Sequence, residues 1–370
     1  MVAKRILVIG MTDNPGGIES LMLGVLSNLD LDKVCLDFVV NTETVAFEQQ
    51  LLSYGARIYK ITPRRRSRRK FYSDLKDIFE NHAKDYIAVW ENANSLGNID
   101  YLVYAKRYGI PYRIMHCHNS VNSEGWIRGL LHVINRVRVR AIATHFWSVS
   151  DQASKWFFGH DFALLPNYRV IDNAVNIQHF LFNKTERNRI RAELCIADDT
   201  ILACNIGRLH PQKNQFLILN VIAELKRRGI PAHIALIGKG DLQYELVQQA
   251  KRLEIADRVH LVGAVSDCKP YYDAADIFFF PSLYEGLSFA LLEAQASGLP
   301  CLVSDGIAAE SLVNENIVVG KLTDTTEQWA NSFQIAMNLP RLQKSKLVGT
   351  RFDISERKHL FDDFLEHEND

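Results

Sequence analysis

Short apolar segments alternate along the whole chain with longer segments in which apolar residues recur every three or four positions. The short segments have the length of β-strands, and the longer ones have helical spacing. Strands are predicted at 5–10, 35–40, 57–61, 86–90, 112–117, 144–149, 201–207, 233–238, 259–263, 277–281, 301–304 and 317–320, and helices at 17–29, 71–82, 214–228, 242–254 and 324–338. Such alternation predicts βαβ units with parallel strands, so the fold class is α/β.

Two sets of about six strands in 370 residues predict two doubly wound, Rossmann-like domains rather than one. We expect an N-terminal domain over 1–168, a C-terminal domain over 169–350, and a terminal helix in 351–370 that packs back towards the N-terminal domain. Helical periodicity lapses over 164–176, which suggests the boundary there. Ligands bind beyond the carboxyl ends of parallel strands, so two such domains predict a central cleft.

The charges are unevenly divided along the chain. Lys plus Arg and Asp plus Glu number 43 each, but residues 1–165 hold 21 basic and 16 acidic residues, which leaves 22 basic and 27 acidic residues for the remainder. A basic first half indicates contact with something anionic.

Cysteine usage and hydropathy bear on the cellular location. The six cysteines are scattered without a Cys-x-x-Cys pair, which favours free thiols in a reducing cytoplasm. The apolar part of "KRILVIG" is short for a signal peptide, and no segment approaches the roughly 18 apolar residues of a spanning helix. We expect a cytoplasmic protein that lies on a membrane surface at most.

The segment "SLYEGLSFALLEAQASGLP" (282–300) predicts a loop followed by a helix that is apolar on nearly every side. Ser288 is a suitable N-cap, and Gly298 a suitable end. Glu285 precedes this helix and Glu293 lies inside it, although a buried carboxylate without a partner is costly. Either the two glutamates bind a ligand, or Glu285 is solvated and Glu293 is tied to a neighbouring backbone group.

Two further loops follow predicted strands. In "CNIGRLHPQKN" (204–214), Arg208 and Lys213 follow a strand end and suit a diphosphate, unless they are exposed loop charges. In "DNPGGIES" (13–20), Gly16 and Gly17 allow backbone amides to approach a phosphate or sugar closely, unless they form an ordinary tight turn.

Taken together, these motifs resemble a known family. The E-x7-E spacing of Glu285 and Glu293, flanked by "PSLYEG" and "ASGLP", the "GRLHPQKN" loop, the Gly-Gly loop and "HCHN" (116–119) are similar to the retaining nucleotide-sugar glycosyltransferases of family 4, which have the GT-B fold. The resemblance covers nearly the whole chain in the same order.

The resemblance implies a role for each matching residue. Glu285 would contact hydroxyls of the transferred hexose, Glu293 the ribose hydroxyls, and Arg208 and Lys213 the donor diphosphate. His118 would lie near the sugar and the acceptor. The other residues implied at the substrate are Gly16, Gly17, His116, Asn119, Gly207, Gly286, Leu287 and Ser288.

No metal or cofactor is expected besides the nucleotide diphosphate sugar, which is the donor substrate. His116 and His118 would share one face of a strand, where either a structural or a substrate-contacting role fits, but the sequence shows no convincing further pair of zinc ligands for them. The first strand is not followed by G-x-G-x-x-G, which disfavours a dinucleotide oxidoreductase. Gly306 and Glu310 are arranged more loosely than the family pattern, so donor contacts from that loop are an open point.

The acceptor is indicated by a basic cluster over 64–70, "RRRSRRK", which is followed by Phe71 and Tyr72. The cluster is either a solvated loop or a contact for anionic headgroups or a lipid diphosphate. The segment 124–141, which contains Trp126, is a second candidate for an interfacial surface, and Phe71, Tyr72 and Trp126 are candidates for insertion. No nucleic-acid-binding module is recognisable, so nucleic acid is not an expected partner.

The expected function is transfer of a hexose, with retention, to a lipid-linked saccharide in cell-surface polysaccharide biosynthesis. The alternatives are a nucleotide-sugar epimerase or glycan phosphorylase of the same fold, and a non-catalytic nucleotide-sugar-binding subunit.

Overall fold

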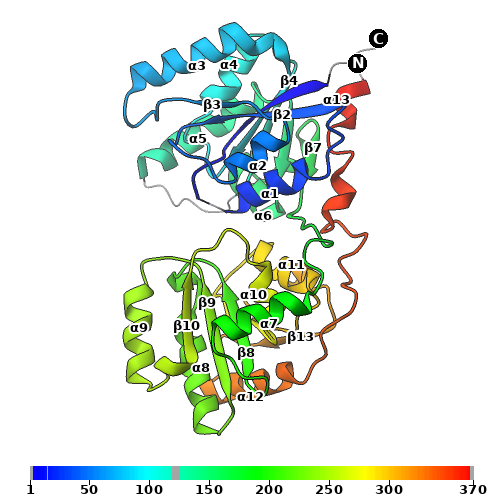
Figure 1. Cartoon of the computed structure of the whole chain (residues 1–370). Helices are drawn as coiled ribbons and strands as arrows, with labels where there is room; N and C mark the ends of the chain where they lie inside the picture. Colours follow the sequence, from blue (N-terminus) through cyan, green and yellow to red (C-terminus); the bar gives the residue numbers. More distant parts are fainter. Residues whose placement is uncertain (1–2, 15, 119–125, 367–370) are drawn as a thin grey trace. The chain divides into compact units, whose positions relative to one another are not determined.

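The computed structural model describes residues 3–14, 16–118 and 126–366, and the chain divides into two compact units (Figure 1). Met1–Asn173 and Ile354–Asp370 form what we call the N-terminal unit, and Ala174–Asp353 form the C-terminal unit. Each unit is an α/β layer structure around one parallel sheet, as the alternating pattern predicts.

The N-terminal unit contains a seven-stranded parallel sheet in the order β3-β2-β1-β4-β5-β6-β7. The strands are β1 (Lys4–Ile9), β2 (Val34–Val40), β3 (Ile58–Lys60), β4 (Tyr86–Ala93), β5 (Tyr112–Cys117), β6 (His145–Ser148) and β7 (Tyr168–Val170). The helices are α1 (Gly17–Leu26), α2 (Glu48–Ser53), α3 (Arg68–His82), α4 (Asp100–Arg107), α5 (Trp126–Arg140) and α6 (Asp151–Phe158). The strand order reverses between β1 and β4.

The C-terminal unit contains a six-stranded parallel sheet in the order β10-β9-β8-β11-β12-β13, which reverses between β8 and β11. The strands are β8 (Ile201–Ile206), β9 (Ala232–Ile237), β10 (Val259–Gly263), β11 (Ile277–Phe280), β12 (Cys301–Ser304) and β13 (Ile317–Gly320). The helices are α7 (Lys184–Glu193), α8 (Gln215–Arg227), α9 (Gln243–Arg252), α10 (Lys269–Ala274), α11 (Phe289–Ala296) and α12 (Thr326–Met337). Both sheets therefore have the strand order of a Rossmann fold, and each has a switch point where ligands bind in such folds.

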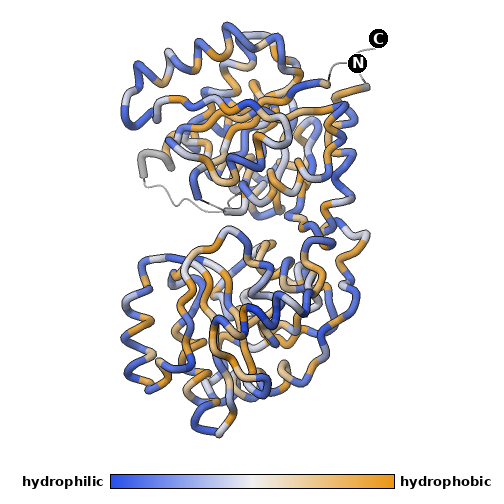
Figure 2. The backbone as a smooth tube through the Cα atoms, viewed as in Figure 1, coloured by the Kyte–Doolittle hydropathy of each residue, from blue (hydrophilic) through white to orange (hydrophobic). Residues whose placement is uncertain are grey.

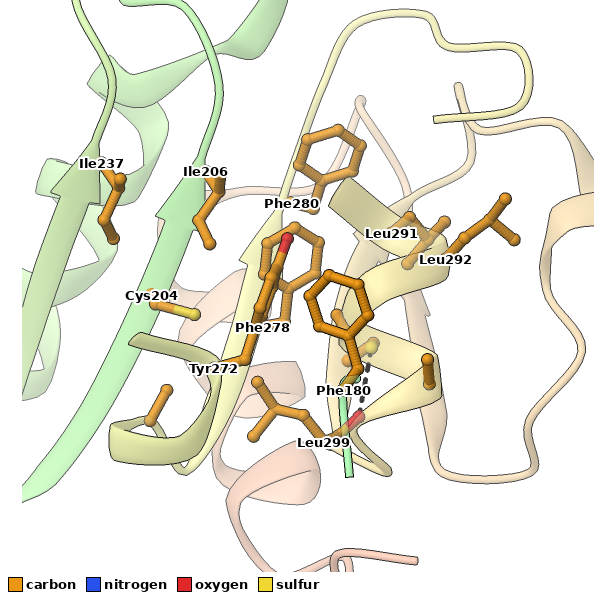
Figure 3. Close-up of a cluster of buried hydrophobic side chains, with 14 of the residues drawn as sticks. Phe180, Cys204, Ile206, Ile237, Tyr272, Phe278, Phe280, Leu291, Leu292 and Leu299 are labelled. Carbon is orange, nitrogen blue, oxygen red and sulfur yellow. Dashed lines mark hydrogen bonds between the residues drawn. The ribbon is translucent and has the colours of Figure 1, made fainter. Parts of the chain in front are cut away.

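The strands of the C-terminal unit are apolar on both faces because helices cover both. Figure 2 shows hydrophobic residues concentrated along the strands and polar residues on the outer turns. Figure 3 shows one face, where Phe278 and Phe280 of β11 and Cys204 of β8 pack near Leu291 and Leu292 of α11. This packing explains why α11 has no polar side, since it is buried against the sheet.

Two elements differ from the sequence-based prediction. The division between the units, after Asn173, falls inside the expected boundary segment 164–176, but this segment also contains β7, an unexpected three-residue strand that pairs with β6 and is too short to show a period. In place of the terminal helix expected in 351–370, the structure has a 3-10 turn, Ile354–Arg357, and a five-residue helix, α13 (Asp362–Glu366).

The segment after residue 353 packs on the sheet of the N-terminal unit. Phe361 and Phe364 are buried, with ring centroids 5.4 Å from Trp90 for Phe361 and 4.7 Å from Tyr112 for Phe364. Trp147 stacks on Phe364 at 6.2 Å. This terminal segment therefore completes the core of the N-terminal unit.

Phe361→Ala should destabilise the N-terminal unit by about 3–5 kcal/mol, the usual cost of truncating a buried Phe, because Phe361 is 1% exposed. Urea unfolding followed by tryptophan fluorescence measures the change. Leu164→Ala, at a side chain 86% exposed in the same unit, is the matched control and should have almost no effect. Equal small effects of the two substitutions would contradict the packing described.

Candidate functional site

The C-terminal unit brings the predicted donor residues together in the loops that follow β8 and β11, the two strands at its switch point. Gly207 and Arg208 follow β8, and Lys213 ends the 3-10 turn Pro211–Lys213. Glu285 follows β11. The loops are in direct contact, since the amide of Leu283 donates to the carbonyl of Gln212 at 2.8 Å.

Lys213 and Glu285 form an ion pair, with 2.6 Å between Nζ and Oε1. Their side chains are only 14% and 11% exposed. Gln212 Nε2 donates to the same carboxylate oxygen at 3.2 Å, and Lys213 Nζ lies 4.7 Å from the centroid of the Phe280 ring. An ammonium group has three donors, so this pair leaves Lys213 able to bind an anion as well.

Arg208 is placed differently from Lys213. Its side chain is exposed and has no ion pair with any residue in the described part of the chain. Its carbonyl accepts a hydrogen bond from Gln215 Nε2 at 2.9 Å, which fixes the backbone while the guanidinium stays in solvent.

Two glycines permit a close approach of backbone segments around this pair. A Cβ at Gly238 would lie 2.0 Å from the carbonyl oxygen of Gly207. Gly207 itself has a φ of +154°, a backbone conformation that other residues rarely adopt. A Cβ at Gly306 would lie 2.2 Å from the carbonyl oxygen of Leu283. A side chain at Gly238 would push the loop after β9 away from the loop after β8, and one at Gly306 would push the loop after β12 away from the loop after β11.

The loop from Gly306 to Glu310, an open point in the sequence, is joined to the backbone of Glu285. The Glu285 amide donates to the Gly306 carbonyl at 3.0 Å, and the Ala308 amide donates to the Glu285 carbonyl at 3.0 Å. The carboxylate of Glu310 pairs with Arg351 at 2.9 Å. Gly306 therefore helps to position Glu285, whereas Glu310 forms a surface ion pair.

Glu293 lies on α11, whose N-cap Ser288 makes no side-chain hydrogen bond to the first turn. Glu293 Oε2 is 2.8 Å from the hydroxyl of Tyr272 on α10, so its partner is a side chain and not a backbone group. Burial raises the pKa of Glu293 to about 7, and the Tyr272 hydrogen bond opposes this shift. The carboxyl is thus close to half-protonated at neutral pH.

In the N-terminal unit, the Gly-Gly loop is held by Glu19 of α1. The buried Glu19 Oε1 accepts hydrogen bonds from the backbone amide and the hydroxyl of Thr12, both at 2.8 Å. Gly16 is the extended N-cap of α1, and Gly17 is its first residue. The loop is therefore built into the start of a helix after β1.

His118 is held by Asn92 at the end of β4. Its Nε2 lies 2.9 Å from Asn92 Oδ1, while Asn92 Nδ2 donates to the carbonyl of Ile9 at 3.3 Å. Since the amide is thus oriented, His118 donates from Nε2 and keeps Nδ1 as an acceptor. Burial lowers the pKa of His118 to about 3, so the ring is neutral at physiological pH.

His116 lies beneath His118, with 4.2 Å between ring centroids, and stacks on Trp90 at 5.9 Å. It is fully buried, and neither ring nitrogen has a hydrogen-bond partner among the described residues. Burial lowers the pKa of His116 well below its usual range. Asn119 lies outside the described residues.

The residues that hydrogen-bond to His118 and Glu293, namely Asn92 and Tyr272, belong to none of the sequence motifs. Asn92 could have been suspected, because "ENAN" (91–94) places polar residues directly after an apolar strand. Tyr272 gives no such signal, since an aromatic residue on a short amphipathic helix ordinarily belongs to the core.

The basic cluster over 64–70 is largely exposed. Arg64 pairs with Asp100 at 3.4 Å and Lys70 with Asp74 at 2.6 Å, whereas Arg65, Arg68 and Arg69 are exposed. No acidic residue occupies the first turn of α3, so three cations lie at the positive end of its helix dipole. This arrangement strengthens the positive potential of that surface.

One expectation about this surface is wrong. Phe71 was a candidate for insertion into a membrane, but it is 1% exposed and packs in the core, because the helical period turns it towards the sheet. The hydroxyl of Tyr72 donates to Asp100 at 2.9 Å. The side chain of Trp126 lies outside the described part.

The described residues include no group of three or more His, Cys, Asp or Glu that could hold a metal ion. None of their helices combines the length and apolarity needed to cross a membrane.

Comparisons with known proteins agree with this fold. Residues 186–346 match the family model described as glycosyl transferases group 1. HepE of Anabaena, solved in complex with UDP and glucose, superposes with a TM-score of 0.76 at 18% identity, over 98% of this chain and 99% of that one. WaaG, described as a glycosyltransferase of lipopolysaccharide biosynthesis, superposes with a TM-score of 0.64 at 14% identity, over 97% and 95%. Fold and domain content therefore support a GT-B glycosyltransferase.

Among individual relatives, EpsF of Bacillus subtilis (strain 168), a protein provisionally named a glycosyltransferase, is 28% identical over 89% of this chain and 86% of its own length. The amylovoran biosynthesis glycosyltransferase AmsK of Erwinia amylovora is 33% identical over 41% of this chain and 38% of its own length. An Escherichia coli galactosyltransferase, named for UDP-Gal and a GlcNAc-diphosphoundecaprenol acceptor, is 30% identical over 37% and 36%.

Lys213→Met and Glu285→Gln should be strongly non-additive in stability. Either change alone leaves a mostly buried charge without its partner, at a cost of about 1–3 kcal/mol, and the double variant should recover at least about 1 kcal/mol of the summed loss. Urea unfolding of the four forms measures this coupling. The exposed pair Lys76–Glu80 is the matched control and should show almost none. Additive effects at Lys213 and Glu285 would mean that the ion pair does not form in solution.

Proposed function

We propose that the chain is a retaining glycosyltransferase of family 4 that transfers a hexose from a nucleotide diphosphate sugar. The observation that carries the proposal is the Lys213–Glu285 pair at the switch point of the group 1 domain, with Glu293 eight residues further on. A cation that suits a diphosphate and a carboxylate that suits sugar hydroxyls are thereby held together.

In the proposed reaction, Lys213 and Arg208 bind the donor diphosphate and stabilise the charge that develops as it departs. Fixed charges aimed at a leaving group are an effective source of acceleration and require no metal. The first amides of α11 add donors for a phosphate oxygen, since Ser288 does not cap them. Glu285 binds hexose hydroxyls through its carboxylate, and Glu293 binds the ribose hydroxyls.

The remaining residues have supporting roles in this proposal. The loop residues Gly207, Gly286, Leu287 and Ser288 contribute backbone groups around the donor. His118 suits a sugar or acceptor hydroxyl, because its neutral ring offers Nδ1 as a hydrogen-bond acceptor. The roles of Gly16, Gly17, His116 and Asn119 rest on the family resemblance and stay predictions.

The acceptor is proposed to be a lipid-linked saccharide in cell-surface polysaccharide biosynthesis. The names of two relatives support this class of acceptor, one for amylovoran biosynthesis and one for a diphosphoundecaprenol-linked sugar. The enzyme would then work at the inner face of the membrane as a peripheral protein.

A surface of the N-terminal unit supports membrane contact. Leu130, Val133, Ile134 and Val137 form a stripe at helical spacing on α5, and each is between 49% and 73% exposed. α5 carries arginines and no acidic residue. An exposed apolar stripe flanked by basic residues is typical of a helix that lies in the headgroup region of an anionic bilayer.

The helix that carries this stripe and the basic cluster both contact the segment that leads from β4 to α4. Arg64 pairs with Asp100, at the end of the loop that follows β4. His132 and Asn135, on the opposite side of α5 from the stripe, bond to the backbone of Leu96 in that loop, at 3.1 Å and 2.7 Å. An apolar and a cationic element are therefore both attached to this one short segment of the N-terminal unit. A second copy of the chain is a poorer partner, because it would bring like charges together.

The donor assignment predicts a specific kinetic change. Lys213→Ala and Arg208→Ala should each lower kcat by about tenfold or more and raise KM less, since they act on charge that develops in the transition state. Lys239→Ala, at an exposed cation that follows β9, is the control and should leave kcat unchanged. Transfer by the purified chain, measured with a panel of nucleotide sugars and a lipid-linked saccharide, provides the assay.

The products also separate the alternatives. Interconversion of nucleotide sugars without an acceptor would indicate an epimerase, and sugar 1-phosphate formed from inorganic phosphate would indicate a phosphorylase. Binding without any turnover would indicate a non-catalytic subunit. Normal turnover of both variants would show that Lys213 and Arg208 are not catalytic.

The membrane assignment predicts binding to vesicles that contain phosphatidylglycerol and none to pure phosphatidylcholine. Changing the six cations of the basic cluster to Gln, or the four stripe residues to Ser, should each reduce binding about tenfold or more. Binding should fall as salt rises past physiological strength, where the screening length is about 8 Å. Leu164→Ser, elsewhere on the unit, is the control in a flotation assay. Wild-type protein that ignores anionic vesicles at low salt would contradict the proposal.

A further inference from the structure

The hydroxyl of Tyr272 lies within hydrogen-bonding distance of two acceptors. It is 3.0 Å from the carbonyl oxygen of Ala290 and 2.8 Å from Glu293 Oε2. A phenol has one proton, and a carbonyl oxygen can only accept. Both contacts are therefore full hydrogen bonds only if Tyr272 donates to Ala290 and receives a proton from a neutral Glu293.

The surroundings of Glu293 favour this neutral form. Tyr272 is fully buried, so no water can take the place of either partner at its hydroxyl. The pKa of Glu293 near 7 has burial as its main cause, and the nearby Asp267 raises it further. The other oxygen, Oε1, has no hydrogen-bond partner among the described residues and is not buried, so it is open to a ligand.

The charged and titratable groups facing Glu293 come from three segments. They are Tyr272, Asp267, Cys268 and His179. His179 Nε2 lies 3.5 Å from Asp267 Oδ1, and this carboxylate raises the pKa of His179. Asp267 raises the pKa of Glu293, whereas protonated His179 lowers it. His179 is therefore the other group near Glu293 that can titrate around neutral pH and must be controlled.

We propose that burial holds Glu293 in its neutral form until a nucleotide binds, so that binding at this carboxyl releases a proton to solvent, and that Tyr272 is a positioning residue that accepts from the neutral form and donates to the ionised form. The inference rests on the proposed function in one respect, namely that Glu293 receives the ribose hydroxyls. Two vicinal hydroxyls are donors, and an ionised carboxylate is their strongest acceptor. When the proton leaves Glu293, Tyr272 rotates its own proton from the Ala290 carbonyl to Oε2, and every group keeps a partner.

The sign of the pH dependence follows from this exchange. The bound state needs the ionised form, which is a minority below pH 7. Nucleotide affinity should therefore rise with pH up to about 7 and level off above it, with release of about half a proton per site at pH 7. Removal of the Tyr272 hydroxyl takes away a hydrogen bond that lowers the pKa of Glu293. The inflection should then move to higher pH.

Calorimetry in buffers of different ionisation enthalpy measures the released protons directly. UDP, GDP, ADP and CDP are tried, and the nucleotide that binds most tightly is used for the wild-type chain and for Glu293→Gln. Subtracting the protons released with Glu293→Gln from those released with the wild type removes the contribution of the nucleotide's own phosphate. We expect about half a proton to be released at pH 7 by the wild type only, and about five- to tenfold weaker binding at pH 6 than at pH 8 that Glu293→Gln lacks.

Tyr272→Phe should move the inflection of affinity upward by about half a pH unit or more. Tyr271→Phe, at the neighbouring position, is its matched control and should leave the profile in place. His179→Gln should retain the proton release, which would exclude His179 as its source. Inorganic diphosphate, which lacks a ribose, should show no difference between wild type and Glu293→Gln.

The outcomes distinguish this inference from the proposed function. If no nucleoside diphosphate binds, the proposed function fails. If a nucleotide binds but the wild type and Glu293→Gln release the same number of protons, the inference is wrong and the donor assignment stands. Should Tyr272→Phe fail to fold, the comparison with Glu293→Gln still decides the question.

Discussion

The ion pair between Lys213 and Glu285 is the interaction on which the candidate site depends. It joins the loop after β8 to the loop after β11, at the point where the strand order of the C-terminal unit reverses. Each of the two loops is packed closely by a neighbouring loop, at Gly238 and at Gly306, where a side chain would collide with a carbonyl oxygen.

Much of this arrangement could be predicted from the sequence, because two periodicities are plain in it. Alternation of strand and helix lengths predicts parallel sheets, and charged residues directly after strands predict side chains gathered at one sheet edge. β7 could not be predicted, since three residues show no period. Phe71 was misplaced because its neighbours are cations, although its helical position turns it inward.

The protonation states and hydrogen-bond directions at Tyr272 and His118 could not be predicted from the sequence, for a different reason. Each depends on the distance between side chains that only the packing of two elements brings together, α10 with α11 at Tyr272 and the ends of β4 and β5 at His118. A residue type at a given position specifies a donor or an acceptor, but only the fold specifies how many partners share one proton. The states of Glu293 and His118 therefore follow from packing and not from a motif.

The central claim is transfer of a sugar with its anomeric configuration kept, and the product's anomeric signal tests it most directly. The purified chain is incubated with the nucleotide sugar that binds it and with a lipid-linked saccharide, and proton NMR follows the first product formed. An α-linked donor should give an α-linked product, with the small anomeric coupling of that configuration. A β-linked product would contradict retention, and the absence of any transfer across the donor and acceptor panel would contradict the enzymatic account as a whole.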